Sequence, residues 1–206
     1  RALGITSAEE QPVLPKGNNL SLYLLELFTS QVAKVGMTDG IRQVLQEESD
    51  ALRAYYEQAG ILIARPAGGT SCRLAISAKG GTNAENHNHN DVGSYAVALG
   101  SETMVGDQGG PNSYPGDYFN GDAPQKYKIK GSFGHPVPVV DGRTQSSGGK
   151  AKGVVLQKEF TNEKDVFSID YTSAYSTPNL DKLIRTFVYD RQGEGNFTVG
   201  DEFTAK

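Results

Sequence analysis

Residues 165–172 read DVFSIDYT, and this stretch decides the fold class. Phe167, Ile169 and Tyr171 occupy alternate positions along it. Successive side chains of a β-strand point to opposite faces, so these three apolar residues share one face of an extended segment. The pattern predicts a strand with one buried face.

Similar runs stand on both sides of this stretch: GVVLQKEF at 153–160, LIRTFVYD at 183–190 and NFTVGDEF at 196–203. The segments TNEKD, SAYSTPN and DRQGEGN separate the runs, and each is rich in residues that form turns. Strands that follow one another at intervals of about a dozen residues indicate an antiparallel meander. We therefore expect a mainly β protein built as an antiparallel, supersandwich-like β-sandwich.

The composition changes near residue 60. Downstream of it, ILIAR, CRLAIS, SYAVALG, ETMVGD and VPVVDG continue the series of predicted strands. Upstream, NNLSLYLLELF and GIRQVLQEESDALRAYYEQAG repeat apolar residues at spacings of three and four, which predicts short helices with Gly60 as the stop. We divide the chain into a helical lead-in at 1–59, the remnant of an upstream domain, and a β-sandwich domain at 60–206 that is truncated at its C-terminus.

Composition excludes several classes of function. The chain has 206 residues, of which 37% are hydrophobic, and a net charge of −4. This balance supports a real core and argues against nucleic acid or membrane as a partner. The single cysteine, Cys72, excludes an internal disulfide and a multi-cysteine zinc site. The first residues, RALGITSAEEQPVLPKG, lack the apolar centre of a signal peptide.

Residues 86–91 read NHNHND and hold two of the chain's three histidines. In an extended segment His87 and His89 would project side by side, with Asn88 facing the other way. Two imidazoles in one small volume repel each other when both are charged. A metal ion or a division of catalytic roles is the usual reason for such a pair.

The third histidine, His135, opens the run HPVPVVDG, and Asp107 ends a predicted strand between the two histidine segments. Two imidazoles and a carboxylate suit Zn²⁺, with a fourth position for water or a substrate oxygen. Residue types alone do not exclude an alternative to a metal site. In that alternative the H-x-H pair is a chance pair on an exposed loop, and the aspartate is a turn residue.

The stretch HNHNDVGSYAVALGSETMVGDQGG, followed by YFNGDAPQKYKIKGSFGHPVPVVDG, resembles the β-sandwich domain of the heparinase II/III-like polysaccharide lyases. The resemblance runs from about residue 50 to the end, with its blocks in the family's order and spacing. It implies that His87 is catalytic and that His89, Asp107 and His135 bind a divalent metal ion, usually zinc. One departure is Val137, close to the place where the family often has an asparagine.

The resemblance also implies a function. Heparinase-like lyases cleave uronic-acid-containing, glycosaminoglycan-like polysaccharides by β-elimination, so the expected partner is an acidic polysaccharide. Their upstream helical toroid supplies a catalytic tyrosine and the group that neutralises the substrate carboxylate. Residues 1–59 are too few for such a toroid, so we expect a fragment that is inactive alone and needs the upstream helical domain. The expected compartment is the periplasm or the cell exterior.

The loop DQGGPNSYPGDYFNGD at 107–122 provides aromatic residues that stack on sugar faces in binding sites. We expect Tyr114, Tyr118 and Asn88 to contact substrate, whereas packing on the sandwich is at least as good an account of Phe119. Two other classes stay open. One is a non-catalytic carbohydrate-binding or structural domain stapled by the metal. The other is a cupin-type metal enzyme, which starts its motif with H-x-H on a strand but requires a glutamate that is missing at residues 94–96.

Overall fold

The structure is a computed structural model that describes residues 51–107, 110–111 and 113–206. The helices expected before residue 51 lie outside this part of the chain. The strands are β1 Arg53–Tyr56, β2 Ile61–Ala64, β3 Leu74–Lys79, β4 Thr82–Asn83, β5 Tyr95–Leu99, β6 Glu102–Val105, β7 Gly148–Lys152, β8 Val154–Phe160, β9 Lys164–Asp170, β10 Leu180–Asp190 and β11 Asn196–Ala205. The short helices are α3 Ala123–Lys126, η1 Lys128–Lys130, η2 Ser132–Gly134 and η3 Thr172–Ala174.

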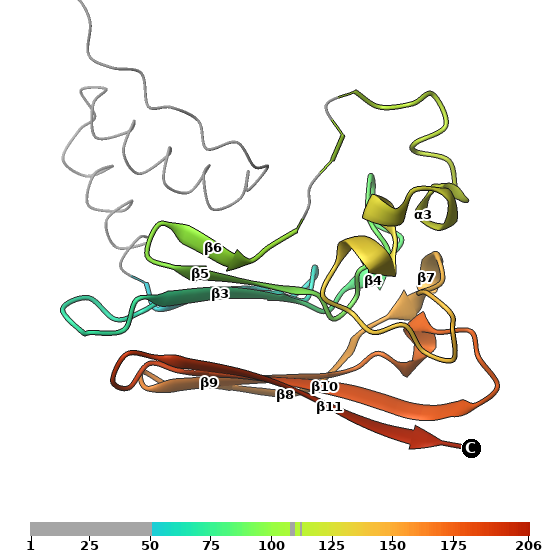
Figure 1. The fold of residues 1–206 in the computed structure, drawn as a ribbon. Helices are drawn as coiled ribbons and strands as arrows, with labels where there is room; N and C mark the ends of the chain where they lie inside the picture. Colours follow the sequence, from blue (N-terminus) through green and yellow to red (C-terminus); the bar gives the residue numbers. More distant parts are fainter. Residues whose placement is uncertain (1–50, 108–109, 112) are drawn as a thin grey trace, which may run out of the picture.

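Two large antiparallel sheets form the two layers of a sandwich (Figure 1). One sheet has the order β1-β2-β3-β5-β6, and the other has the order β11-β10-β9-β8. The second sheet is the meander predicted from residues 153–203, with each strand paired to the next along the chain. The strands β4 and β7 form a separate small sheet at one end of the sandwich. The predicted antiparallel β-sandwich is confirmed.

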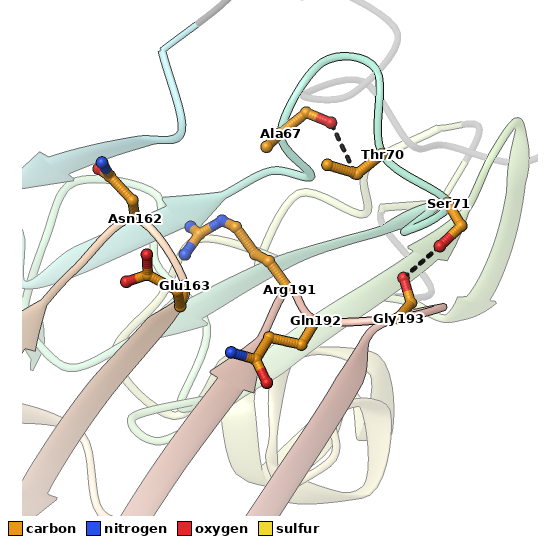
Figure 2. Close-up of a pocket in the computed structure, with 8 residues that line it drawn as sticks. All are labelled: Ala67, Thr70, Ser71, Asn162, Glu163, Arg191, Gln192 and Gly193. Carbon is orange, nitrogen blue, oxygen red and sulfur yellow. Dashed lines mark hydrogen bonds between the residues drawn. The ribbon is translucent and has the colours of Figure 1, made fainter.

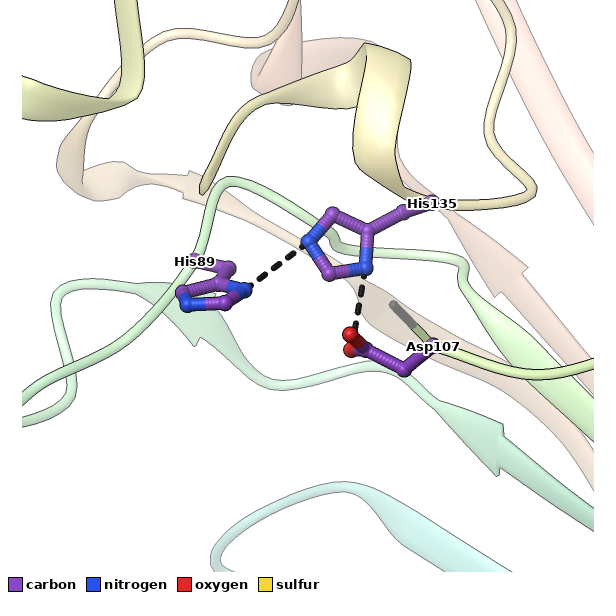
Figure 3. A group of neighbouring side chains, drawn as sticks. All are labelled: His89, Asp107 and His135. Atoms are coloured by element: carbon purple, nitrogen blue, oxygen red, sulfur yellow. Dashed lines mark hydrogen bonds and ion pairs between the residues drawn. The ribbon is translucent and has the colours of Figure 1, made fainter. Parts of the chain in front are cut away.

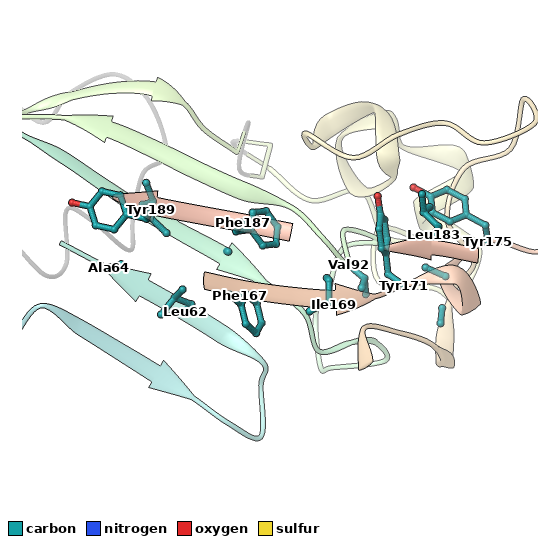
Figure 4. Close-up of a cluster of buried hydrophobic side chains, with 14 of the residues drawn as sticks. Leu62, Ala64, Val92, Phe167, Ile169, Tyr171, Tyr175, Leu183, Phe187 and Tyr189 are labelled. Atoms are coloured by element: carbon teal, nitrogen blue, oxygen red, sulfur yellow. The ribbon is translucent and has the colours of Figure 1, made fainter. Parts of the chain in front are cut away.

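The core lies between the two large sheets (Figure 4). Phe167, Ile169 and Tyr171 are fully buried, as their alternation predicted. Phe187 of β10 pairs with Phe167 across the sheet, and Leu62 of β2 contributes to the same cluster from the opposite layer. Burying each such side chain contributes about 1.5–3 kcal/mol, so this row of apolar residues is the main force that holds the layers together.

Two predicted elements are wrong. Residues 53–56, expected at the end of a helix, form β1, and Gly60 lies in the turn to β2 with a φ of 62°. Helical spacing over so few residues competes poorly with pairing to an adjacent strand. Residues 137–142 form no strand, and the bridge between Val140 and Arg143 is the pairing found there. Pro136 and Pro138 lack the N–H groups that a ladder needs.

One end of the sandwich carries the segments that contain the three histidines. The small sheet and the segment from α3 to η2 cover this end (Figure 1). Within the described residues, no helix combines the length and the apolar character needed to cross a membrane.

Candidate functional site

Three of the predicted site residues converge at this end (Figure 3). His89 precedes β5, Asp107 follows β6, and His135 follows η2. Val97 of β5 pairs with Val105 of β6, so the chain entering β5 and the chain leaving β6 meet at the same end of the sheet. The α3–η2 segment lies over that end and brings the third residue to the other two.

The three side chains form a chain of close contacts. His89 Nδ1 lies 3.0 Å from His135 Nε2, and one of these two nitrogens donates a hydrogen bond to the other. His135 Nδ1 lies 3.1 Å from Asp107 Oδ2. This His135 nitrogen is buried and makes no hydrogen bond of normal geometry within the described chain. The two contacts use opposite nitrogens of the His135 ring, so a single metal ion would bind only one of them.

The donor set fits a metal ion. One ligand atom from each of His89, Asp107 and His135 lies within 4.8 Å of the other two. Zinc–ligand bonds of about 2.0–2.1 Å in a tetrahedral arrangement place ligand atoms about 3.3 Å apart, so at least one of the three side chains would shift to hold a zinc ion. The Asp107 side chain is 46% exposed, whereas that of His135 is buried. The cluster could therefore bind a metal ion with one side toward solvent.

The surroundings favour a neutral imidazole at His89. Burial lowers its pKa below the usual value, and the neighbouring His135 acts in the same direction. Asp107 and Asp91 oppose this shift to a smaller extent. A neutral imidazole is the form that binds a metal ion.

Gln145 ties the two histidine segments together from beneath. Its side-chain amide donates to the carbonyl of Val92 at 2.7 Å and accepts from the N–H of the same residue at 2.9 Å. Its own N–H donates to Ser132 Oγ at 2.9 Å. Val92 follows His89 by three residues, and Ser132 precedes His135 by three. The buried glutamine therefore fixes the relative position of the two ligand-bearing segments.

Arg185 of β10 makes a second such link. Its Nη1 donates to the carbonyls of Gly93 at 2.8 Å and Pro136 at 2.7 Å. Its Nε and Nη2 donate to the two carboxylate oxygens of Asp201 at 2.8 and 2.6 Å. The guanidinium thus fastens both segments to the four-stranded sheet.

His87 does not join the cluster. The expectation that it shares a strand face with His89 is wrong, because residues 84–87 form a turn and His87 has a φ of 59°. The N–H of Asn88 donates to the Glu85 carbonyl at 3.2 Å, which closes the turn. The exposed His87 ring instead stacks on Phe119, with ring centroids 4.3 Å apart. The two histidines therefore lie in different environments.

The predicted substrate contacts divide in the structure. Tyr114 is exposed, but Tyr118 is only 2% exposed, so its ring cannot face a sugar as expected. Tyr118 packs under Tyr114 and Phe119 and beneath the ammonium of Lys130. Phe119 is 48% exposed and supplies the open aromatic face. Asn88 donates its side-chain amide to the carbonyl of His89 at 2.8 Å, which shapes the turn.

Sequence reasoning missed three residues of this site: Gln145, Arg185 and Lys130. Lys130 is 3% exposed, and its Nζ donates to the carbonyl of Tyr118 at 2.8 Å. In the run KYKIK it has the spacing of a solvated charge cluster, so no signal in the sequence distinguishes it. Gln145 and Arg185 likewise become recognisable only when their buried partners are known.

The protein is thus a two-layer antiparallel β-sandwich with a candidate His–His–Asp metal site at one end. The fold is similar to that of the heparan sulfate lyase HepC from Pedobacter heparinus, with a TM-score of 0.62 and 18% sequence identity. A mutant of the same enzyme gives a TM-score of 0.62 and 17% identity. No protein-family model and no curated protein sequence matches the chain.

The likeness to HepC covers 89% of this chain but 28% of the lyase. The resemblance to the heparinase-like lyases that the sequence suggested is thus borne out at the level of the fold. The cupin alternative loses support, because its H-x-H pair belongs on a strand and residues 87–89 lie in and beside a turn.

Proposed function

We propose that this chain forms the β-sandwich part of a polysaccharide lyase that cleaves uronic-acid-containing polysaccharides by β-elimination. The observation that carries the proposal is the convergence of His89, Asp107 and His135, distant in sequence, within a fold shared with a heparan sulfate lyase. The exposed His87 beside this centre supports it further.

Elimination at a uronate breaks the C5–H and C4–O bonds and forms a C4–C5 double bond. A base takes the proton from C5, an acid protonates the leaving oxygen on C4, and the neighbouring carboxylate must be neutralised. His89 and His135 are occupied with each other and with Asp107. We assign the proton transfer to His87, because it is exposed and lies outside the cluster. A histidine changes charge near neutral pH and so serves as base or acid.

The aromatic residues next to His87 suit a sugar. Phe119 stacks on the His87 ring and is half exposed. Tyr114 is also exposed, and its ring centroid lies 5.1 Å from that of Phe119. Apolar sugar faces pack against such rings. We propose Phe119 and Tyr114 as the platform that presents the uronate to His87, with the buried Tyr118 as its support.

We propose that the metal is zinc, held by His89, Asp107 and His135. When bound, it would act mainly as a clamp on the loop that aims His87. The protein contributes the buried anchors Gln145 and Arg185, which hold the ligand-bearing segments whether or not proton transfer occurs.

Two further elements of the proposal concern the whole protein. Since the chain spans 28% of the length of HepC, we propose that a helical domain of the same protein completes the catalytic set with a tyrosine and a carboxylate-neutralising group. We also propose that this protein acts in the periplasm or outside the cell, where its acidic polysaccharide substrate is found.

The test compares His87→Ala with His89→Ala. The His87 variant should keep its metal content and melting temperature, and in the protein that joins this chain to its helical domain it should lower elimination by about 10²-fold or more. The His89 variant should lose metal and stability, because binding free energy adds to folding free energy. Metal is measured by elemental analysis, and elimination by ultraviolet absorbance of the unsaturated product.

Two outcomes would overturn the proposal. Loss of metal in the His87 variant would remove the division of roles. Binding of polysaccharide without any unsaturated product, in the protein that includes the helical domain, would favour a non-catalytic carbohydrate-binding domain.

A further inference from the structure

The outer face of the five-stranded sheet is an unusual surface of this protein. Leu62 and Ile76 belong to the core between the two layers, so the alternate positions of β2, β3 and β5 point away from that core (Figure 1). The strand register places Ile63, Ser77 and Ala96 in one row across this outer face. We define the outer patch as six outward residues: Ile61, Ile63, Ala75, Ser77, Ala96 and Ala98.

Charge is nearly absent from this face. Lys79 is the one charged residue at the outward positions of the five described strands, and its Nζ is paired with Asp91 at 2.6 Å. The outer face of the four-stranded sheet differs, because each of its strands carries charge there: Glu159, Lys164, Asp170, Lys182, Asp190 and Glu202. Polar residues at the outward positions are typical of an antiparallel sheet that meets water on one side.

The sequences of the central strands agree with a covered face. β2 reads ILIA and β5 reads YAVAL, so apolar residues occupy the inward and the outward positions alike. Continuous apolar runs are typical of strands that are buried on both faces. Tyr56 pairs with Ile61 at the border of the outer patch and is 55% exposed. An apolar surface of this kind marks a place where another element packs.

The inner face of the same sheet is already committed to the other layer. Arg191, which follows β10, donates from Nε to the Arg65 carbonyl at 2.7 Å and from Nη2 to the Leu52 carbonyl at 3.0 Å. These bonds fasten the open end of the β1–β2 hairpin to the four-stranded sheet, beside a cavity (Figure 2). Polar side chains such as Asn162 and Gln192 line that cavity, so it offers no comparable apolar surface.

The chain upstream of β1 contains a segment of matching character. Residues 20–35 hold two charged side chains, Glu26 and Lys34. At about 100° per residue, an apolar stripe about 140° wide runs along one side of a helix built from this segment. The stripe consists of Leu20, Leu24, Leu27, Phe28, Val32 and Val35. Such a helix measures about 24 Å, close to the width of about 19 Å that five strands span at a spacing of about 4.8 Å.

The connection to β1 keeps this segment within reach of the outer patch. β1 is an edge strand of the same sheet and begins at Arg53. Residues 36–50 span up to about 50 Å when extended, which exceeds the width of the sheet. A tether of this kind gives an effective concentration of about millimolar, far above that of a second copy in dilute solution. The chain's own segment is therefore favoured over self-association as the occupant.

We propose that residues 20–35 dock as an amphipathic helix on the outer patch, with the apolar stripe toward the sheet, and so add a third layer to the sandwich. The small side chains of Ala75, Ala96 and Ala98 allow a helix to approach the sheet closely. The upstream chain is then held on the sandwich instead of leaving it as a free linker. The proposal uses no residue of the histidine centre and stands whether or not the protein is a lyase.

Hydrogen–deuterium exchange of the 206-residue chain, read by mass spectrometry of its peptides, tests this docking. An isolated helix of about 16 residues is marginal in water, so protection of residues 20–35 requires a packing partner. We expect these amides to exchange at least about tenfold more slowly than in a synthetic peptide of the same sequence. Exchange as fast as in that peptide would overturn the proposal.

Variants identify the two surfaces that meet. Leu24→Lys places a charge on the apolar stripe, and Ser77→Lys places one in the middle of the outer patch. Burying either charge is costly, so each variant should lower the protection of residues 20–35 by about tenfold or more. The matched controls should leave this protection unchanged. They are Ala33→Lys, on the opposite side of the segment, and Thr198→Lys, on the exposed outer face of the four-stranded sheet.

Amide protection of β9 and β10 reports on the sandwich itself and should stay the same in these variants. If Ser77→Lys lowers it, Tyr56→Lys at the exposed border of the patch takes its place. His89→Ala should leave the protection of residues 20–35 unchanged, which separates this test from that of the lyase function.

Two further results would overturn the proposal. Loss of protection with Leu24→Lys but not with the patch variants would mean that the segment packs elsewhere. Protection that rises with protein concentration, together with a dimer in size-exclusion chromatography, would assign the outer patch to a second copy.

Discussion

Replacing Arg185 by Met tests how the fold holds the histidine centre. The methionine keeps an apolar stem between the rings of Tyr95 and Tyr171, which flank the guanidinium at 5.8 and 5.6 Å. The substitution removes the hydrogen-bond donors to the Gly93 and Pro136 carbonyls. The Asp201 carboxylate loses the guanidinium and keeps its hydrogen bond from the Tyr171 hydroxyl.

The expected loss follows from these contacts. Breaking a buried ion pair costs about 3–5 kcal/mol, and each carbonyl left unsatisfied costs about 1 kcal/mol or more. The Asp201 side chain is 33% exposed, so water offsets part of its lost partner, and the lower end of the range applies. With about 3 kcal/mol for the ion pair and about 1 kcal/mol for each of the two carbonyls, we expect Arg185→Met to lower the free energy of unfolding by about 5 kcal/mol, a large share of the 5–15 kcal/mol of a typical domain.

Urea unfolding of the 206-residue chain measures this loss. Lys182→Met is the matched control, because Lys182 lies on the same strand in an exposed ion pair with Glu202 at 3.7 Å. Such pairs contribute about 0–1 kcal/mol. The double variant with Asp201→Leu should lose about 1–3 kcal/mol less than the sum of the single variants, because the two side chains interact directly. An Arg185 variant no less stable than the Lys182 variant would refute the assignment of Arg185 as the anchor of both histidine segments.

Two more predictions concern the same centre. Gln145→Leu should cost about 2–4 kcal/mol in urea unfolding, because the Val92 N–H and carbonyl and the Asn83 amide lose their buried partner, whereas exposed Gln157→Leu should cost little. Burial lowers the pKa of His89 in the folded chain below its usual 6.5. As the pH falls below about 6.5, the unfolded chain takes up a proton at this histidine before the folded chain does. The free energy of unfolding should therefore decrease as the pH falls from about 6.5 toward the lower folded pKa. In chelator, His89→Ala should flatten this dependence of unfolding free energy on pH, and an unchanged slope would contradict the cause assigned.

Alternation along the strands carried most of the fold prediction. Phe167, Ile169 and Tyr171 identify a buried face because a strand offers its side chains to two faces only. Ser168 is also 5% exposed and bonds Thr186 on the outer face, which alternation alone does not reveal. Residues 53–56 were misassigned because their apolar spacing also suits a helix, and only their pairing with β2 settles the conformation.

The cluster of His89, Asp107 and His135 was predictable because the chain has only three histidines and because the resemblance to the heparinase-like lyases pointed to Asp107. The position of His87 was not predictable, since its left-handed φ depends on the turn that Glu85 and Asn88 close. Gln145 has no sequence signal either. Its importance comes from the burial of its amide against Val92, which lies 53 residues earlier in the chain.

The two histidines of the H-x-H motif differ most in how firmly they are held. His89 is followed by Asn90, whose N–H donates to the Lys130 carbonyl at 2.7 Å, and its segment is tied down by Gln145 and Arg185. His87 rests on a surface turn and on the face of Phe119. The proposed role of His89 as a metal ligand requires such a fixed position, whereas the role proposed for His87 requires access to a substrate. A spacing of one residue thus separates an anchored side chain from an exposed one, because His87 ends the turn at 84–87 and His89 lies in the segment that Asn90 and Gln145 hold.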